Sequence, residues 1–371
     1  MPDSGERTDE LEAVVVGADE IGDVRVGFDA RLELVDAYGR HAGTWRMLDP
    51  LDWCLAASDR DPDRFDAVDL ELLRWCHRLV VTRICGTPRV DLARIRSTLD
   101  DLERRQLAGG RGPRPLHAIR CHLADHMGDE AGARAWLERW QTGTTANTAG
   151  TGSADAGDCA GCDLSAQAAL RSGWGDSAAA VRTVEAIGSA AVAGCSDQPE
   201  RGLVTVLLPL LRLGRHDEAA WAHVEAYRRH RHERPAFPYL GEHLRFCALA
   251  GQHRRGLEIL TRHLGWLDRP TDERSAMEFA AAGALVCRLA DEAGLATPTV
   301  SELGAELAAT ARDLGQRFDA RNGTTHQSRR MASWLSERPV SEPIPVPPDD
   351  DPDDWAAPPT TADPTGWRRW A

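Results

Sequence analysis

The chain has 371 residues, of which 42% are hydrophobic, and its formal net charge is −14. That length allows two or three compact units or one elongated array. All 44 basic residues are arginine, and the absence of lysine excludes P-loop phosphate binding, Schiff-base chemistry and a lysine general base. The acidic balance disfavours nucleic-acid binding, because such a chain repels phosphate unless it carries a strong local basic patch.

The N-terminal residues 1–27 are polar and acidic, without a cationic start followed by a long apolar stretch. The run Val14–Val16 is too short for a signal peptide or a membrane span, so we expect a cytoplasmic protein. Nine cysteines, an odd number spread along a long chain, favour free thiols or a metal site over a disulfide framework.

The first part of the chain reads as a flexible acidic arm over 1–27, followed by helices. Apolar residues at helical spacing are strongest over Ala67–Ile84. Over Val90–Leu107, Leu92, Ile95, Leu99 and Leu102 form one clean stripe. This pattern predicts helices over Phe28–Tyr38, Trp45–Leu55, Ala67–Ile84 and Val90–Leu107.

From Pro115 onward one unit recurs: an apolar helix, a tight turn with glycine, and a second helix that opens with acidic residues or alanine. The turn glycines are placed at Gly128, Gly173, Gly214 and Gly251. Glycine suits the left-handed residue that ends a helix, and acidic residues suit the start of the next one. Because a helical hairpin cannot bury its apolar face alone, the repetition predicts an all-α solenoid.

These patterns give five segments. The arm over 1–27 precedes an N-terminal helical region over 28–142 that includes the first hairpin. A flexible insertion rich in glycine and threonine covers 143–157, and further repeats with C-terminal capping helices cover 158–337. Within this last region a further helix pair is predicted over 275–291 and 300–318, and a capping helix over 324–335. A disordered acidic tail rich in proline and aspartate covers 338–371.

The hairpins resemble tetratricopeptide (TPR) repeats. That family has glycine at the turn, a small residue five places later and another seven places after that, which Gly214, Ala219 and Ala226 match. Gly173 with Ala178, Gly251 with Gly256, and Gly128 with Ala133 match in part, and Ala166 is the small first-helix residue of the second copy. The spacings exceed the family period, so the repeats are divergent TPR-like hairpins.

A narrower resemblance covers roughly residues 30–337. Several short segments look like those of a group of actinobacterial TPR-like proteins without an assigned activity, which implies a fold but no function. The segments are Asp158–Asp163, Gly214–Ala220, Phe246–Gly251, Arg262–Asp268 and Phe318–Thr324.

One group of residues has the spacing of a metal site. Cys159 and Cys162 open the first helix of the second hairpin, and Cys195 follows its second helix, so the three thiols are expected at the same end of the hairpin. Three thiolates suit Zn²⁺, and we expect a structural rather than a catalytic ion. The fourth ligand is not evident from the sequence. A reversible Cys159–Cys162 disulfide and three inert thiols are the alternatives.

The most basic stretch, Arg228–Arg234, is the candidate partner-binding surface, with Arg228, Arg229 and Arg231 as its cations. It suits an acidic peptide, and the acidic tail of the same chain is one candidate ligand. The alternative is an ordinary cationic helix end, which the helix dipole favours.

No complete catalytic motif occurs, so the sequence predicts a non-enzymatic scaffold or adaptor that binds a protein or peptide of unknown identity. The alternative function is a zinc- or redox-responsive regulator that uses Cys159, Cys162 and Cys195. An enzyme with unlinked catalytic residues between hairpins has no positive support in the sequence.

Overall fold

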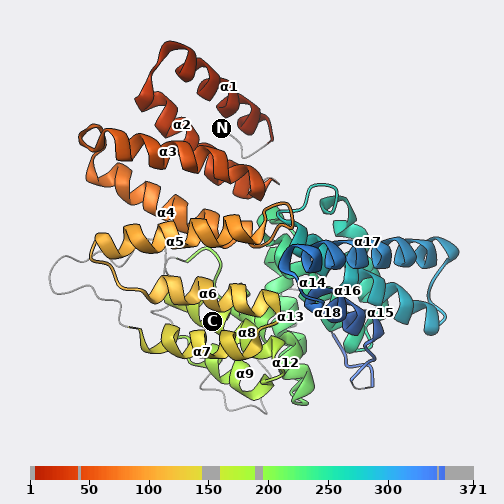
Figure 1. The fold of residues 1–371 in the computed structure, drawn as a ribbon. Coiled ribbons are helices and arrows are strands. Elements are labelled where there is room, and N and C mark those ends of the chain that lie inside the picture. Colours follow the sequence, from red (N-terminus) through yellow and green to blue (C-terminus); the bar gives the residue numbers. More distant parts are fainter. Residues whose placement is uncertain (1–4, 41–42, 144–158, 189–194, 341, 347–371) are drawn as a thin grey trace. The chain divides into compact units, whose positions relative to one another are not determined.

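The computed structural model describes residues 5–40, 43–143, 159–188, 195–340 and 342–346, and every regular element in these ranges is a helix (Figure 1). The predicted all-α class is therefore confirmed. The chain forms two compact units. The first comprises residues 1–149, 269–276 and 316–325, and the second comprises 150–268, 277–315 and 326–371. No helix of the described ranges is long and apolar enough to cross a membrane.

The first unit consists mainly of seven α-helices that follow one another along the chain. The helix predicted over Ala67–Ile84 has those bounds, and the other three predicted helices overlap observed ones whose ends lie one to five residues away. The helices are α1 (Gly5–Ile21), α2 (Val24–Arg40), α3 (Leu48–Arg60), α4 (Ala67–Ile84), α5 (Leu92–Ala108), α6 (Arg114–Met127) and α7 (Glu130–Thr142), with 3₁₀ turns at Thr44–Met47 and Pro62–Arg64.

The N-terminal segment differs from the flexible arm that the sequence predicts over 1–27. Its described residues form α1 and the start of α2, and polar contacts hold the two helices together. Arg31 of α2 donates to Asp19 of α1 at 2.6 Å, and Tyr38 donates its hydroxyl proton to Glu12 at 2.9 Å. These partners are 12 and 26 residues apart, so local periodicity could not indicate them.

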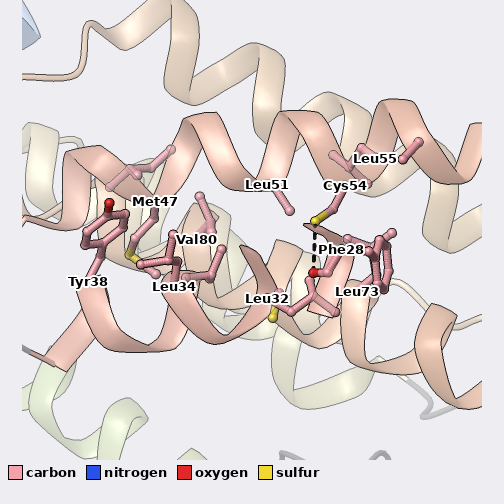
Figure 2. Packing of buried hydrophobic residues seen from close by; sticks show 14 of the residues in the cluster. Phe28, Leu32, Leu34, Tyr38, Met47, Leu51, Cys54, Leu55, Leu73 and Val80 are labelled. Atoms are coloured by element: carbon pink, nitrogen blue, oxygen red, sulfur yellow. Dashed lines mark hydrogen bonds between the residues drawn. The ribbon is translucent and has the colours of Figure 1, made fainter. Parts of the chain in front are cut away.

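The core of the first unit lies between α2, α3 and α4 (Figure 2). Phe28 is fully buried and its ring lies 4.3 Å from that of Phe65, measured between centroids. Cys54 is also fully buried, and its thiol faces the carbonyl oxygen of Phe28 at 3.8 Å. The same buried cluster includes Leu32, Leu51, Met47 and Val80.

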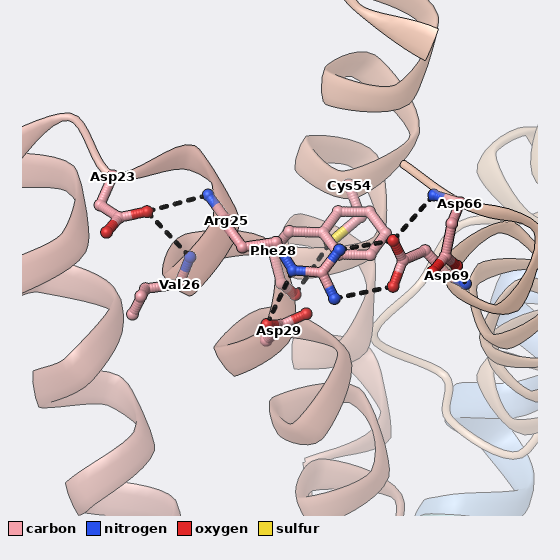
Figure 3. A network of polar contacts seen from close by, with 8 residues as sticks. All are labelled: Asp23, Arg25, Val26, Phe28, Asp29, Cys54, Asp66 and Asp69. Carbon is pink, nitrogen blue, oxygen red and sulfur yellow. Dashed lines mark hydrogen bonds and ion pairs between the residues drawn. The ribbon is translucent and has the colours of Figure 1, made fainter. Parts of the chain in front are cut away.

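A polar network fixes the start of α4 (Figure 3). Asp66 is the N-cap and accepts from the backbone N–H groups of Val68 and Asp69, while the Asp69 carboxylate accepts from the Asp66 backbone N–H. Arg25 of α2 reaches the same Asp69 carboxylate with both terminal nitrogens, at 2.8 Å for Nη2–Oδ1. Asp69 thus joins a helix cap to a cross-helix ion pair.

Most of the remaining helices belong to the second unit. Two of them are shared: α16 begins in the first unit and ends in the second, and α17 begins in the second and ends in the first. The helix pair predicted over 275–291 and 300–318 corresponds to α16 and α17, and the capping helix predicted over 324–335 corresponds to α18. The helices are α8 (Ala160–Gly173), α9 (Ser177–Glu185), α11 (Glu200–Thr205), α12 (Leu207–Arg212), α13 (His216–His230), α14 (Phe237–Leu249), α15 (His253–His263), α16 (Glu273–Glu292), α17 (Pro298–Asn322) and α18 (His326–Ser336), with 3₁₀ turns at Arg234–Ala236 and Leu264–Trp266.

Adjacent helices pack as pairs, namely α6 with α7, α8 with α9, α12 with α13 and α14 with α15. Glycines with positive φ stand at the turns of these pairs. They are Gly128, Gly175, Gly214 and Gly251.

The turn of the second pair therefore differs from the sequence-based prediction. Gly173 is the last residue of α8, and Gly175 takes the left-handed conformation. The expected packing residue Ala178 is exposed, whereas Ala180, five residues after Gly175, is fully buried. In the first helix of the pair the same two-residue shift replaces Ala166 with the buried Ala168.

Two predicted segments lie largely outside the described residues. Of the insertion over 143–157 only Gly143 is described, and of the tail over 338–371 only residues 338–340 and 342–346 are described. These tail residues lie on the second unit, and Ile344 is buried there.

Candidate metal centre

Three cysteines of the second unit come together at the start of two helices. Cys159 is the N-cap of α8, Cys162 lies in the first turn of that helix, and Cys195 precedes α11. The packing of α8 against α9 and α11 brings these chain positions to one place. The convergence that the sequence spacing predicts is therefore present.

The sulfur atoms have the spacing of a metal-binding group. All three lie within 4.8 Å of one another, and Cys162 Sγ is 3.5 Å from Cys195 Sγ. Sulfurs at the corners of a tetrahedron around Zn²⁺, with Zn–S bonds of about 2.3 Å, are about 3.8 Å apart. The three cysteines could therefore bind a metal ion such as zinc with little rearrangement.

Backbone N–H groups donate hydrogen bonds to two of the sulfurs. The Cys162 N–H donates to Cys159 Sγ at 3.4 Å, and the N–H groups of Asp197 and Gln198 donate to Cys195 Sγ. Burial acts to raise the pKa of Cys195, but these donors and the neighbouring thiols outweigh it and lower the pKa. Such donors stabilise a thiolate, which is the form that ligates metal.

Cys162 has a different environment, because burial raises the pKa of its thiol to about 12. The guanidinium of Arg201 hydrogen-bonds this sulfur and acts in the opposite direction. The Gln198 side-chain amide donates to Ser165 Oγ at 2.9 Å and lies 3.7 Å from Cys162 Sγ. A dication at this place would favour the Cys162 thiolate, and Arg201 would balance the negative charge of three thiolates around one divalent ion.

The described residues contribute no fourth ligand to the group of three sulfurs. Of the nearby carboxylates that the sequence offers, Asp163 accepts from Gln167 Nε2 at 3.2 Å and Asp197 lies 3.9 Å from Arg201. Asp158 lies outside the described residues. A three-thiolate set leaves one tetrahedral position for water or another exogenous ligand.

The candidate partner-binding arginines lie at the end of α13 beside acidic side chains. Arg228 pairs with Glu225 at 3.4 Å, and Arg229 pairs with Glu200 at 3.2 Å and with Glu233 at 3.0 Å. Arg231 Nε donates to the exposed His232 at 3.0 Å. The positive charge of Arg228 and Arg229 is thus partly compensated within the chain, and binding by this cluster stays a prediction.

Sequence reasoning missed a buried histidine network in the second unit. His230 Nδ1 lies 3.1 Å from His243 Nε2, His243 Nδ1 lies 3.0 Å from His223 Nδ1, and His223 Nε2 lies 3.8 Å from Cys247 Sγ. A neutral imidazole donates from one nitrogen and accepts at the other, so the protons are ordered in one direction along the chain of rings. The signal available in the sequence was the seven-residue spacing of His223 and His230, two turns along one face of α13.

No family model matches the chain, and no curated protein matches its sequence. The chain is an all-helical protein for which these comparisons identify no family.

Proposed function

We propose that the protein is a non-enzymatic scaffold of divergent TPR-like hairpins that binds a protein or peptide segment. The observation that carries this proposal is one relationship repeated at four helix pairs. In each, a glycine with positive φ is followed five residues later by a buried small residue. The pairs are Gly128 with Ala133, Gly175 with Ala180, Gly214 with Ala219, and Gly251 with Gly256.

The small residue at the fifth position lets its helix lie close both to its paired helix and to the next one. At Gly256 a Cβ atom would lie 2.9 Å from a methyl group of Val286 and 3.3 Å from Cys247 Cβ, so no side chain fits without displacement of a neighbour. Hairpins of this kind bury their apolar faces by stacking on neighbours, and a stack of them is a solenoid. Solenoids present extended surfaces that suit protein segments better than small substrates.

The sequence supports a binding function over catalysis. It contains no lysine, no GxSxG nucleophile elbow and no complete metalloprotease motif.

Zinc is the cofactor that the thiol cluster fits best, in a structural role. An ion held by Cys159, Cys162 and Cys195 would join the start of α8 to the segment before α11 and so close the second hairpin at one end. Thiolates are the preferred ligands of structural zinc, and the N–H donors at Cys159 and Cys195 are the outer-shell partners that such ligands need.

A redox-responsive regulator is the second candidate, and one distance favours it. Cys162 Sγ and Cys195 Sγ are 3.5 Å apart, so a small movement would let them form a disulfide, as would the Cys159–Cys162 pair that the sequence suggested, whose sulfurs lie within 4.8 Å of each other. Oxidation by a peroxide would join the two sulfurs, reduce the peroxide by two electrons and remove two zinc ligands at once.

Affinity capture of the tagged full chain from cells that make it naturally, with mass-spectrometric identification, tests the scaffold proposal. We expect a partner in stoichiometric amount that binds the chain again when both are purified. A chain that captures no such partner but turns over a small molecule would contradict the proposal.

A further inference from the structure

The residues that follow α18 lie along the turn between α14 and α15. We call residues 337–340 and 342–346 the C-terminal strap. It has no regular secondary structure, and most of its side chains are exposed. Three kinds of contact nevertheless hold it on the second unit: backbone hydrogen bonds, one buried apolar side chain and one carboxylate.

Backbone hydrogen bonds attach the strap to the end of α14. The Val340 N–H donates to the Leu249 carbonyl at 3.0 Å, and the Ile344 N–H donates to the Ala250 carbonyl at 3.2 Å. The side-chain amide of Gln252 donates to the Ile344 carbonyl. Carbonyls at the C-terminal end of a helix have no partner within the helix, so the strap satisfies groups that the hairpin leaves open.

The apolar contact centres on Gly251 and Ile344. Ile344 is only 6% exposed. A Cβ atom built on Gly251 would lie 2.9 Å from Pro343 Cα, so the strap crosses this turn where only glycine leaves room. The equivalent turn glycine Gly214 has nearly the same φ, +72° against +71°, but nothing lies within 4 Å of its Cβ position.

The carboxylate of Glu337 anchors the other end of the strap. Arg245, itself only 8% exposed, donates to it with two nitrogens, at 2.7 Å for Nε–Oε2. The same guanidinium lies 4.1 Å from the ring centroid of Trp334, and Arg288 donates to the Glu337 carbonyl at 2.5 Å. A fork-shaped pair of this kind selects a carboxylate by geometry as well as by charge.

We propose that this surface is a docking site for an extended segment of a partner protein, and that the strap is its intramolecular occupant. The partner segment has a carboxylate seven residues before an aliphatic side chain that is flanked by prolines, as Glu337 precedes Ile344 in the strap. Main-chain hydrogen bonds supply affinity, and the carboxylate and the aliphatic side chain supply selectivity. Proteins that bind extended peptides commonly combine these two contributions. The inference rests on the proposed scaffold function and assigns it a site and a partner class.

Release of the strap in the full chain, followed by addition of its peptide, tests the proposal. Ile344→Asp removes the apolar anchor, and Val340→Asp is the matched control, since Val340 is 47% exposed and keeps its backbone N–H. We expect a labelled peptide of residues 336–346 to bind Ile344→Asp at least about tenfold more tightly than the wild type or Val340→Asp. In the Ile344→Asp chain, Arg245→Gln should abolish this binding, and a peptide with aspartate in place of Ile344 should not bind.

Equal or absent binding of the peptide in all three chains would overturn the proposal. A wild-type dimer that forms with rising concentration and is lost in Ile344→Asp would also overturn it, because the occupant would then be a second copy. A stoichiometric captured partner that binds wild type and Arg245→Gln equally would refute this site while leaving the scaffold proposal intact.

Hydrogen exchange provides a readout that does not depend on added peptide. Gly251→Ala and Gly214→Ala carry the same positive-φ penalty, but only the first pushes a Cβ atom into the strap. We expect the Val340 and Ile344 amides to exchange at least about tenfold faster in Gly251→Ala and at the wild-type rate in Gly214→Ala. Equal exchange in both variants, or unprotected amides in the wild type, would contradict the docked strap.

Discussion

Cys162 Sγ and Cys195 Sγ lie 3.5 Å apart although 33 residues separate them in the chain. Their approach depends on the packing of α8 against α9 and α11. Cys162 lies in the first turn of α8, and the Cys195 sulfur accepts hydrogen bonds from the backbone N–H groups of Asp197 and Gln198. A bond through zinc at this point would therefore stabilise the fold of the hairpin itself.

The packing register of the second hairpin can be tested at two alanines of α9. Ala180 is fully buried and Ala178 is exposed. We expect Ala180→Leu to lower the free energy of unfolding by about 1–3 kcal/mol, because added methylene groups overpack the helix contact. Ala178→Leu should change it by less than about 0.5 kcal/mol. Urea unfolding, followed by circular dichroism, measures both losses. A larger loss for Ala178→Leu than for Ala180→Leu would show that the hairpin packs as the sequence predicted, with Gly173 as the turn glycine.

The Arg25–Asp69 pair supports the start of α4, and Asp69→Asn tests it. We expect a loss of about 1–2 kcal/mol, since the change weakens a helix cap and an ion pair whose arginine is half exposed. Asp29→Asn is the matched control, because Asp29 bonds the same guanidinium at 3.1 Å but caps no helix. Chemical denaturation at neutral pH measures both variants. A loss for Asp69→Asn no larger than that for Asp29→Asn would show that the cap contributes nothing.

Acid should unfold the protein through its buried histidines. Burial lowers the pKa of His223 to about 3 and those of His77, His230 and His263 to about 4, and it lowers the pKa of His243 as well. The unfolded chain binds protons near the ordinary histidine pKa of about 6.5, whereas the folded chain does not. The free energy of unfolding should therefore have its full value above about pH 6.5. Between about pH 6.5 and pH 4 it should fall by up to about 1.4 kcal/mol per pH unit for each such histidine.

Urea midpoints measured from pH 8 to pH 4.5 check this expectation. His77→Leu removes one of the titrating groups, so its midpoint should fall less steeply with pH than that of the wild type. A midpoint that stays constant from pH 7 to pH 5 would contradict the buried neutral state of these rings.

The sequence was informative where local pattern decides structure. The period of the apolar residues predicted the helix over Ala67–Ile84, which is α4. The spacing of the cysteines predicted that Cys195 lies beside Cys159 and Cys162, and the structure brings the three sulfurs together. Glycine identity alone was not sufficient in the second turn, because Gly173 and Gly175 both fit a helix end. The positive φ of Gly175 and the burial of Ala180 distinguish them in the structure.

Contacts between distant residues explain the differences. Helix α1 lacks a clear apolar stripe, and partners on α2 such as Arg31 hold it in place. The start of the tail lies on the α14–α15 turn because Leu249 and Ala250 offer carbonyl groups to it. The described tail residues contact the end of α14 through Val340 and Ile344. The acidic run Asp349–Asp354, for which the sequence suggested Arg228–Arg234 as the docking surface, lies outside the described residues.

The zinc content of the purified full chain tests the candidate metal centre directly. After purification with a reductant that does not bind metal, elemental analysis should give one zinc per chain, and none for Cys195→Ser. The matched control Cys85→Ser changes another half-buried cysteine and should keep the wild-type ratio. Removal of zinc by a chelator should lower the melting temperature of the wild type and leave that of Cys195→Ser unchanged. A wild-type chain that stays free of zinc when zinc is supplied, or a Cys195→Ser chain with the same zinc ratio, would show that Cys159, Cys162 and Cys195 do not form a zinc site.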